Sequence, residues 1–331
     1  MSNKEELLKV NNLIKSFSVR RGVFGRDEFK AVDDISFTIL KEPPTFFTVI
    51  GESGSGKTTL ARLILGLIRP TSGKIIYDGK DIWKMREEEW KKYRKEVQAV
   101  FQDPFSTYNP FYRVSRVLMM PLLQYKLVNG KKEAYEIISK SLEVAGLRKD
   151  EVIDRFPHQL SGGQRQRIML ARALMLKPTL ILADEPVSMV DASIRASLLN
   201  TMLDMKNKFK ISFIYITHDL STAYYLTDKM AVMYLGNFVE IGPAEKIINE
   251  PLHPYTQMLI ESVPIADPKH RWKSKVNLPS TEYSIRGRFK GCKFYERCSV
   301  KNEICKNIKP KLVDVGGRSV MCAQYTENGK Y

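Results

Sequence analysis

The feature that most constrains the fold is a glycine-rich string, Gly51-Glu-Ser-Gly-Ser-Gly-Lys57-Thr58, which fits the pattern G-x-x-x-x-G-K-[ST]. It follows a short β-prone apolar run, Phe46–Ile50, and precedes a stretch with helical spacing of apolar residues, Thr58–Ile68. In this context backbone N–H groups converge on phosphate oxygens at the start of a helix. We expect Lys57 to reach the β- and γ-phosphates and the Thr58 hydroxyl to ligate Mg²⁺. The string therefore predicts a nucleoside-triphosphate site.

Strands that alternate with helical patterns predict an α/β core with a mostly parallel sheet. Two short buried-type strands are expected at Leu180–Ala183 and Ile211–Thr217, each followed by a helical pattern, Ser193–Lys206 and Leu220–Leu226. Few strand signals occur from about Asp103 to Leu176, so we expect a helical insertion there. It includes an amphipathic stretch, Glu133–Leu147, whose apolar side holds the following residues: Ile137, Ile138, Leu142 and Ala145.

The N-terminal part predicts a half-exposed antiparallel edge to this core. Two partly alternating apolar runs, Leu7–Val19 and Ala31–Leu40, are typical of strands with one solvated face. Between them lies a glycine-punctuated basic segment, Arg20–Asp27, which we expect to be a loop.

The positive charge of the chain is concentrated near its C-terminal end. The 331 residues carry a net charge of +16, from 53 Lys+Arg against 37 Asp+Glu. Between Lys269 and Val313 there are 13 basic and 3 acidic residues, a net of +10. All four cysteines also lie near this segment, between Cys292 and Cys322. Charge of this kind is compatible with nucleic acid, an anionic membrane surface or a polyanionic ligand, so by itself it excludes little.

No apolar stretch reaches the roughly 18 to 20 residues that a membrane-spanning helix needs. The longest candidate, Ile168–Val187, is interrupted by Arg172, Lys177, Asp184 and Glu185. The N-terminus has no apolar core of a secretory signal. We therefore expect the chain to stay in the cytoplasm.

Two further motifs narrow the class. The apolar strand Leu180–Ala183 ends in Asp184 and Glu185, of which the first can hold Mg²⁺ through water and the second can polarise an attacking water. An isolated acidic turn of this kind is common, but a chance match becomes improbable about 125 residues after a phosphate loop. The string Leu160-Ser161-Gly162-Gly163-Gln164 precedes an amphipathic helix, Arg165–Leu176, and offers a second anion site at a helix start.

With these motifs in order, the chain resembles the ATP-binding subunits of ABC transporters over roughly Leu7–Gly242. The resemblance implies a P-loop NTPase core of ABC type. It assigns adenine stacking to Phe17, with Phe24 as the alternative. It assigns ATP binding to the phosphate loop and to the acid of the buried strand: Gly51, Glu52, Ser53, Gly54, Ser55, Gly56, Lys57, Thr58, Thr59 and Asp184.

The same resemblance assigns the catalytic roles. Glu185 is the general base, His218 lies near the γ-phosphate, and Gln102 contacts Mg²⁺ and water. Asp191 matches the D-loop aspartate of that family. The string Leu160–Gln164 matches the family's signature string. In such proteins two ATP molecules lie between two subunits, so the signature string is expected to contact the partner's ATP through Ser161, Gly162, Gly163 and Gln164. Closure of the pair is expected to act on two transmembrane permease subunits.

Two segments resemble the di- and oligopeptide importer branch of that family. They are Phe101–Pro110 and Pro251–Pro264. In addition, the basic segment before Ala31 resembles one of the two paired ATPases of this branch more than the other. This implies that the chain forms a heterodimer with a homologous ATPase at the cytoplasmic face of the membrane, as a peripheral protein. It also implies that an extracytoplasmic solute-binding protein is an indirect partner. Oligosaccharides or nickel are alternative cargoes, because the ATPase does not touch the substrate.

The cysteines are spaced Cys292-x5-Cys298-x6-Cys305-x16-Cys322. Structural zinc prefers closer pairs, whereas four thiolates with loop-length gaps suit an iron–sulfur cluster. The peptide-importer branch carries a [4Fe-4S] site with this pattern, so we expect one here, with zinc, disulfides or free thiols as alternatives. Nearby basic residues are expected to offset the cluster's charge and favour thiolates: Lys290, Lys293, Arg297 and Lys306.

Two domains are expected: an ATP-binding domain, residues 1–245, with a helical subdomain at about 103–176, and a small irregular extension, residues 246–331. The main rival function is a soluble ABC ATPase or a cysteine module acting on nucleic acid. A single ATPase cassette and about 100 residues between Lys57 and Ser161 argue against the translation and DNA-repair relatives. We expect no specific nucleic-acid partner.

Overall fold

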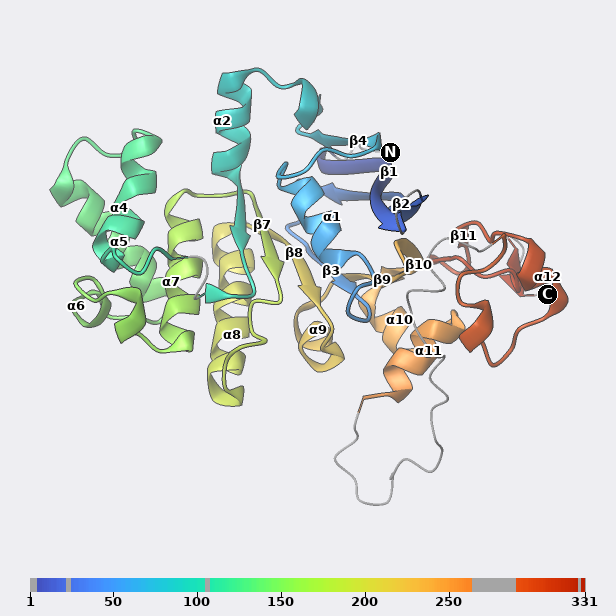
Figure 1. Ribbon diagram of the computed structural model, residues 1–331. Helices are drawn as coiled ribbons and strands as arrows, with labels where there is room; N and C mark the ends of the chain where they lie inside the picture. Colours follow the sequence, from blue (N-terminus) through green and yellow to red (C-terminus); the bar gives the residue numbers. More distant parts are fainter. Residues whose placement is uncertain (1–4, 22–24, 105–107, 264–289, 327–328, 331) are drawn as a thin grey trace. The chain divides into compact units, whose positions relative to one another are not determined.

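The computed structural model describes residues 5–21, 25–104, 108–263, 290–326 and 329–330. These residues divide into two compact units. The first comprises Met1–Leu7, Ile39–Phe46 and Tyr77–Ile216, and the second comprises Leu8–Thr38, Phe47–Ile76 and Thr217–Tyr331. Strand β7 (Leu180–Asp184) and helix α7 (Gly162–Met175), which carry the acidic motif and the string Leu160–Gln164, belong to the first unit, and helix α1 (Lys57–Ile64) and the cysteines belong to the second. These strands and helices are labelled in Figure 1.

The first unit holds three parallel strands and most of the helices. Strand β7 (Leu180–Asp184) pairs in parallel with β6 (Val97–Val100) and with β8 (Ser212–Thr217). Its other elements are β5 (Lys80–Asp81), α2 (Glu87–Glu96), α4 (Val114–Gln124), α5 (Lys131–Val144), α6 (Lys149–Val152), α7 (Gly162–Met175), α8 (Ala192–Phe209) and two 3₁₀ turns, Ile82–Lys84 and Pro157–Gln159.

Burial explains why these elements form. Every residue of β7 and β8 is buried, as expected for parallel strands covered on both faces, and this is why their sequences are continuous apolar runs. Helices α4 to α7 lie in the stretch where the sequence predicts a helical insertion. Helix α5 buries Ala134, Ile138 and Leu142, which are spaced four residues apart and so share one face.

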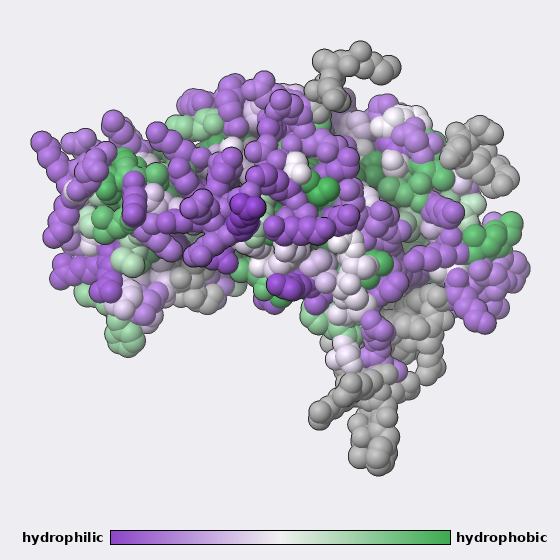
Figure 2. Space-filling view, turned by 90° about the horizontal axis from the view of Figure 1, so that it is seen from above, coloured by the Kyte–Doolittle hydropathy of each residue, from purple (hydrophilic) through white to green (hydrophobic). Residues whose placement is uncertain are grey.

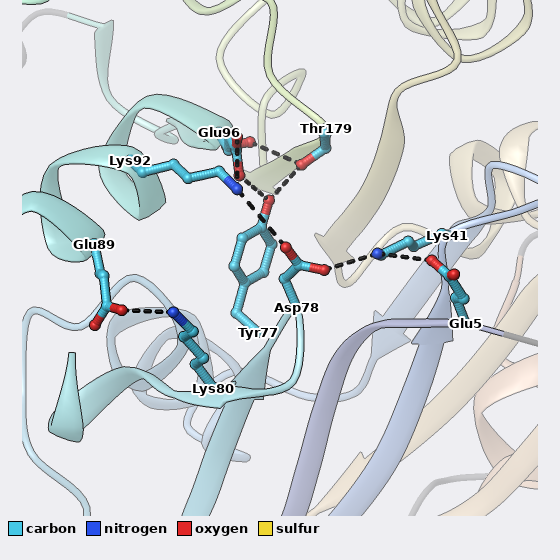
Figure 3. A network of polar contacts seen from close by, with 9 residues as sticks. All are labelled: Glu5, Lys41, Tyr77, Asp78, Lys80, Glu89, Lys92, Glu96 and Thr179. Atoms are coloured by element: carbon cyan, nitrogen blue, oxygen red, sulfur yellow. Dashed lines mark hydrogen bonds and ion pairs between the residues drawn. The ribbon is translucent and has the colours of Figure 1, made fainter.

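A network of polar contacts holds the turn after Tyr77 in this unit (Figure 3). The Tyr77 hydroxyl donates to Glu96 Oε2 at 2.9 Å and lies 2.6 Å from Thr179 Oγ1. Burial raises the pKa of Tyr77 well above its usual value, so its hydroxyl remains a donor. Beside it, Asp78 forms an ion pair with Lys41 at 2.7 Å. The network thereby joins the end of α2 to the segment before β7.

The second unit is built on two sets of strands. One set has the order β2 (Gly25–Leu40), β1 (Glu6–Arg21), β4 (Ser72–Tyr77). In the other, β9 (Lys229–Tyr234) runs parallel to β3 (Phe46–Ile50) and antiparallel to β10 (Asn237–Pro243). The remaining elements are α1 (Lys57–Ile64), α9 (Leu220–Leu226), α10 (Ala244–Asn249), α11 (Pro254–Glu261), α12 (Glu303–Asn307), β11 (Val313–Asp314), β12 (Ser319–Val320), β13 (Tyr325–Thr326), β14 (Gly329–Lys330) and a 3₁₀ turn, Tyr295–Arg297.

The prediction of a loop at Arg20–Asp27 is wrong at both ends of that segment. Strand β1 continues to Arg21 and β2 already begins at Gly25. The two strands are neighbours, so their backbone groups pair with each other whatever the charge of the side chains. Residues 22–24, and with them Phe24, lie outside the described residues.

The C-terminal extension is less irregular than expected, because it adds strands to the sheet of the second unit. Strand β12 pairs antiparallel with β10, with Val320 opposite Glu240, and β11 pairs with β12. Phe294 packs in one buried cluster with Tyr234 and Tyr255. The extension therefore shares a hydrophobic core with the strands that follow the acidic motif.

Hydrophilic residues dominate the face seen in Figure 2, where apolar residues form small separate groups. No helix in the described part of the chain is long and apolar enough to cross a membrane.

Candidate functional site

The phosphate loop lies between a buried strand and a helix, as predicted. Strand β3 ends at Ile50 and α1 begins at Lys57, with Gly56 as its N-cap at a φ of +113°. The Lys57 ammonium donates to the carbonyl oxygens of Gly51 at 2.7 Å and of Glu52 at 2.8 Å. The loop thus wraps around its own lysine, which holds a positive charge at the start of the helix.

Two glycines of this loop occupy positions that no other residue fits. A Cβ added to Gly56 would lie 2.1 Å from the Ala31 carbonyl oxygen, and one added to Gly51 would lie 2.2 Å from the Met233 carbonyl oxygen. The buried Ser55 hydroxyl has no hydrogen-bond partner among the described residues. A close backbone turn and an unsatisfied buried hydroxyl fit a loop whose missing contacts are supplied by phosphate.

The other loop residues line the same turn. Ser53, Gly54 and Thr58 are exposed, and Thr59 is half-buried in the first turn of α1. Hydroxyl oxygen is a ligand type that Mg²⁺ accepts, so the position of Thr58 fits its expected role.

The acidic motif lies at the end of β7, in the first unit. Asp184 is 7% exposed, and Glu185 follows with a backbone φ of +47°. A left-handed conformation is uncommon for glutamate and is often found at functional sites. The Glu185 N–H donates to the Ile216 carbonyl oxygen of β8 at 2.8 Å, which fixes this turn.

Gln102 lies beside the acidic motif. Its side-chain amide donates to Glu185 Oε2 at 2.9 Å. The structure therefore brings together two of the three residues that the sequence marks as catalytic. The amide orients the carboxylate that is expected to act as the base.

The signature string forms the N-terminus of α7, which begins at Gly162, three residues earlier than expected. The Ser161 hydroxyl accepts from the Gln164 N–H at 3.2 Å, and the Gln164 side-chain oxygen accepts from the Ser161 N–H at 3.0 Å. This reciprocal capping box stabilises the helix start. A Cβ on Gly163 would lie 2.8 Å from a methyl carbon of Ile194 in α8, so this glycine permits close helix packing.

The remaining expected site residues lie at the ends or edges of strands and helices. Asp191 is exposed and is the N-cap of α8. His218 is exposed directly after β8. Phe17 on β1 is 37% exposed, with its ring stacked on Phe29 at 5.7 Å between centroids. An exposed and supported ring of this kind suits stacking on a base.

The four cysteines are gathered in the extension, and none forms a disulfide. The Cys292 N–H donates to the Cys305 carbonyl oxygen at 2.8 Å. Burial, together with the nearby thiols of Cys322, Cys305 and Cys298, raises the pKa of Cys292 to about 11. Within the described residues, no group of three or more His, Cys, Asp or Glu side chains has the arrangement of a metal site.

Burial opposes the expected effect of the neighbouring basic residues on the thiols. Burial raises the pKa of Cys298 as well as that of Cys292. Two of the four basic residues are bound elsewhere. Arg297 pairs with Glu52, and Lys293 pairs with Asp33 at 3.1 Å.

Asp33 forms ion pairs with three lysines, and no sequence pattern predicted this cluster. Burial would raise its pKa, but the charge of Lys293 and hydrogen bonds from Lys30, Lys293 and Lys309 lower it to about 2. Tyr255 and Arg297 were also missed as neighbours of the phosphate loop. They lie more than 200 residues from Glu52 in sequence, and no local pattern marks such a contact.

Strand β3, the glycine loop and helix α1 define the chain as a P-loop nucleoside triphosphatase. Comparison with known proteins sharpens this class. The family described as ABC transporter matches residues 32–188, and the family described as oligopeptide/dipeptide transporter, C-terminal region, matches residues 239–305.

Similar proteins cover nearly the whole chain. It is 39% identical to the dipeptide transport ATP-binding protein DppF of Escherichia coli over 96% of this chain and 94% of the relative. It is 38% identical to the oligopeptide transport ATP-binding protein AppF of Bacillus subtilis over 98% of this chain and 99% of the relative. Among solved structures, the dimeric ADP- and phosphate-bound cassette MJ0796 has a TM-score of 0.61 at 24% identity, over 72% of this chain and 98% of that chain.

The chain therefore belongs to the family of ABC transporter ATP-binding proteins, and it carries the C-terminal region found in oligopeptide/dipeptide transporters. Its predicted resemblance, its α/β ABC-type fold and its class as an ATPase are confirmed. The oligosaccharide and nickel alternatives find no support in the names of these relatives.

Proposed function

We propose that this chain is the ATP-hydrolysing subunit of an importer of di- and oligopeptides. The observation that carries the proposal is the presence, in one chain, of a complete phosphate loop and a C-terminal region matching the oligopeptide/dipeptide transporters. Relatives named as dipeptide and oligopeptide transport proteins, matched along nearly their whole length, support it.

In the proposed mechanism the loop Gly51–Thr59 binds the phosphates of ATP, and Phe17 stacks on adenine. Thr58, Asp184 and Gln102 would supply oxygen ligands to Mg²⁺, and the ion would neutralise phosphate charge. Glu185 takes a proton from the attacking water, and its hydrogen bond from Gln102 orients it for this task. His218 contacts the γ-phosphate from the end of β8.

The second nucleotide surface is proposed to face a partner. Ser161, Gly162, Gly163 and Gln164 form a helix N-terminus that is suited to the γ-phosphate of a neighbouring subunit's ATP. Asp191 contacts the partner at the same interface. The proposed partners are one homologous ATPase and two permeases, at the cytoplasmic face of the membrane, with a solute-binding protein acting on the far side.

The proposed domains correspond to these proposed functions. Residues 1–245 form the ATP-binding domain, with the helical subdomain at about 103–176, and residues 246–331 form the extension. The helical subdomain, together with Gln102, transmits closure of the ATPase pair to the permeases.

Affinity purification of the tagged chain from detergent-solubilised membranes tests the proposed partners. We expect one second ATPase of similar size and two polytopic membrane proteins in the purified complex. The Gly56→Ala chain serves as the control for proteins that adhere to misfolded material. Recovery of nucleic acid and soluble factors in place of membrane proteins would contradict the importer assignment.

We further propose that the four cysteines hold a [4Fe-4S] cluster, with zinc as the second candidate. The donor set supports it. Four cysteines, none of them in a disulfide, lie in one short segment and offer four sulfur ligands. Metal binding would displace the thiol protons, so assembly should be favoured at higher pH.

Metal analysis after anaerobic purification tests this assignment. We expect brown protein with about four irons and four sulfides per chain. Cys305→Ser should reduce the iron content strongly, whereas Ser299→Ala, in the same segment, should leave it unchanged. A colourless protein with about one zinc per chain would show that the cysteines bind zinc and not an iron–sulfur cluster.

A further inference from the structure

We propose that Arg297 positions the phosphate-binding loop, so that the cysteine-bearing segment 290–326 is part of the working ATP site. The inference rests on the ATPase assignment but not on the identity of the transported solute or of the metal. It goes beyond the proposed function, because it gives the extension a direct effect on ATP affinity.

The first observation is a two-pronged ion pair between distant parts of the second unit. Arg297 Nη1 lies 2.8 Å from Glu52 Oε2, and Arg297 Nη2 lies 2.7 Å from Glu52 Oε1. The Arg297 side chain is 14% exposed and that of Glu52 is 30% exposed. Fork-to-fork pairing fixes both groups in one geometry, and partial burial reduces screening by salt. This pair is therefore unlike the mobile ion pairs of an open surface.

The second observation is that Glu52 is held at every polar group. Its side chain accepts from Arg297, its backbone N–H donates to the Tyr255 hydroxyl at 2.9 Å, and its carbonyl oxygen accepts from Lys57 at 2.8 Å. Glu52 is the second residue of the phosphate loop, and Lys57 is the lysine expected on the phosphates. A shift of Glu52 would therefore shift the carbonyl that helps to place this ammonium.

Aromatic side chains also hold Arg297 in place. Its guanidinium lies 5.7 Å from the ring centroid of Phe294 and 5.8 Å from that of Tyr234. The Phe294 ring meets Tyr234 edge-on at 5.3 Å and Tyr255 at 5.4 Å. Cation–π contacts and close packing give the guanidinium one preferred place. Phe294 is part of the cysteine segment, between Cys292 and Cys298, so the order of that segment decides where Arg297 lies.

A second connection reaches the other end of the loop. Lys293, next to Cys292, donates to the Leu235 carbonyl oxygen at 2.6 Å and pairs with Asp33. The next residue, Gly236, donates its N–H to the Ser55 carbonyl oxygen at 2.8 Å. The cysteine segment thus contacts the loop at Glu52 directly and near Ser55 through the β9–β10 turn.

The charges of these groups predict the direction in which the loss of Arg297 changes ATP binding. Arg297 neutralises a carboxylate that belongs to a loop built for phosphate. Without Arg297, the Glu52 charge would repel ATP and its side chain would lose its anchor. Arg297 contacts no nucleotide in this scheme. It is a positioning residue that acts through Glu52.

Calorimetric titration of the purified full-length chain with ATP and Mg²⁺ tests the proposal. We expect Arg297→Ala to weaken ATP binding by about tenfold, and Arg297→Lys, which keeps one charged donor, to weaken it less. Adding Glu52→Gln to Arg297→Ala should restore most of the affinity, because the unpaired carboxylate is then removed. Lys301→Ala, which removes an exposed positive charge from the same segment, is the matched control and should bind as the wild type does.

The outcomes separate the proposal from a general loss of stability. Iron content and thermal midpoint are measured on each variant, and rescue by a second substitution is not expected of a merely unstable protein. Wild-type affinity in Arg297→Ala, or a double variant that is weaker than both single variants, would overturn the proposal. If Arg297→Ala does not fold, Arg297→Lys decides, and wild-type affinity in that variant overturns the proposal. A wild-type chain that binds no ATP would instead refute the ATPase assignment.

Discussion

Glu185→Gln is expected to lower steady-state ATP hydrolysis by about a hundredfold or more while ATP binding stays within about twofold of the wild type. The amide keeps the size of the carboxylate but does not accept the proton of the attacking water. Its position after β7 and its contact with Gln102 are compatible with glutamine, so the fold should persist. The measurement is phosphate release by the membrane complex, paired with ATP titration of the purified chain.

The matched control for that variant is Glu136→Gln, on the exposed face of α5. It makes the same chemical change away from any proposed site and should hydrolyse ATP at the wild-type rate. Undiminished hydrolysis by Glu185→Gln would assign the general base to another group.

Gly56→Ala is expected to abolish measurable ATP binding and to destabilise the chain. The new methyl group would lie 2.1 Å from the Ala31 carbonyl oxygen, at a φ of +113° that alanine rarely adopts. Strain and overlap together should cost about 3 kcal/mol or more. A loss of that size lowers the thermal midpoint by about 6 °C or more, which scanning calorimetry detects.

Gly130→Ala provides the comparison for this substitution. Gly130 precedes α5, has an extended backbone, and an added Cβ would meet nothing within 4 Å. We expect a cost of at most about 1 kcal/mol and unchanged ATP binding. Equal stability and ATP affinity of the Gly56→Ala and Gly130→Ala chains would refute the steric argument for the loop.

Local signals made the centre of the fold predictable. Strand β3 and helix α9 have the bounds expected from the sequence, Phe46–Ile50 and Leu220–Leu226. A fully buried strand reads as a pure apolar run, and the Asp219 side chain caps α9 by accepting from the Ser221 N–H. These features need no knowledge of the rest of the chain.

Elements whose stability comes from distant partners were not predicted. Helix α2 is almost entirely charged and buries only Tyr93, so it has too few apolar residues to predict a buried face. Strands β9 and β10 join through a turn at Leu235 and Gly236, both with positive φ, but leucine is not a turn-forming residue. The sheet partners, β3 and β12, supply what the local sequence lacks.

The sequence predicted the strand ends and helix starts that carry the candidate site residues, but not the contacts between those residues. The phosphate loop, the acidic motif and the signature string each formed the expected strand end or helix start. The bond between Gln102 and Glu185, and the ion pair between Arg297 and Glu52, join residues far apart in sequence. Composition indicated that the basic residues serve the cysteines. The structure shows that Arg297 and Lys293 pair with carboxylates of Glu52 and Asp33 instead.

Peptide uptake by the reconstituted complex tests the central proposal most directly. The complex isolated with this chain is placed in liposomes with ATP on the side of the ATPases, and a labelled dipeptide with its binding protein is supplied on the other side. We predict ATP-dependent accumulation of the dipeptide by the wild-type complex and none by the complex carrying Glu185→Gln. Accumulation that is equal in the two complexes, or a wild-type complex that hydrolyses ATP without moving peptide, would contradict the account.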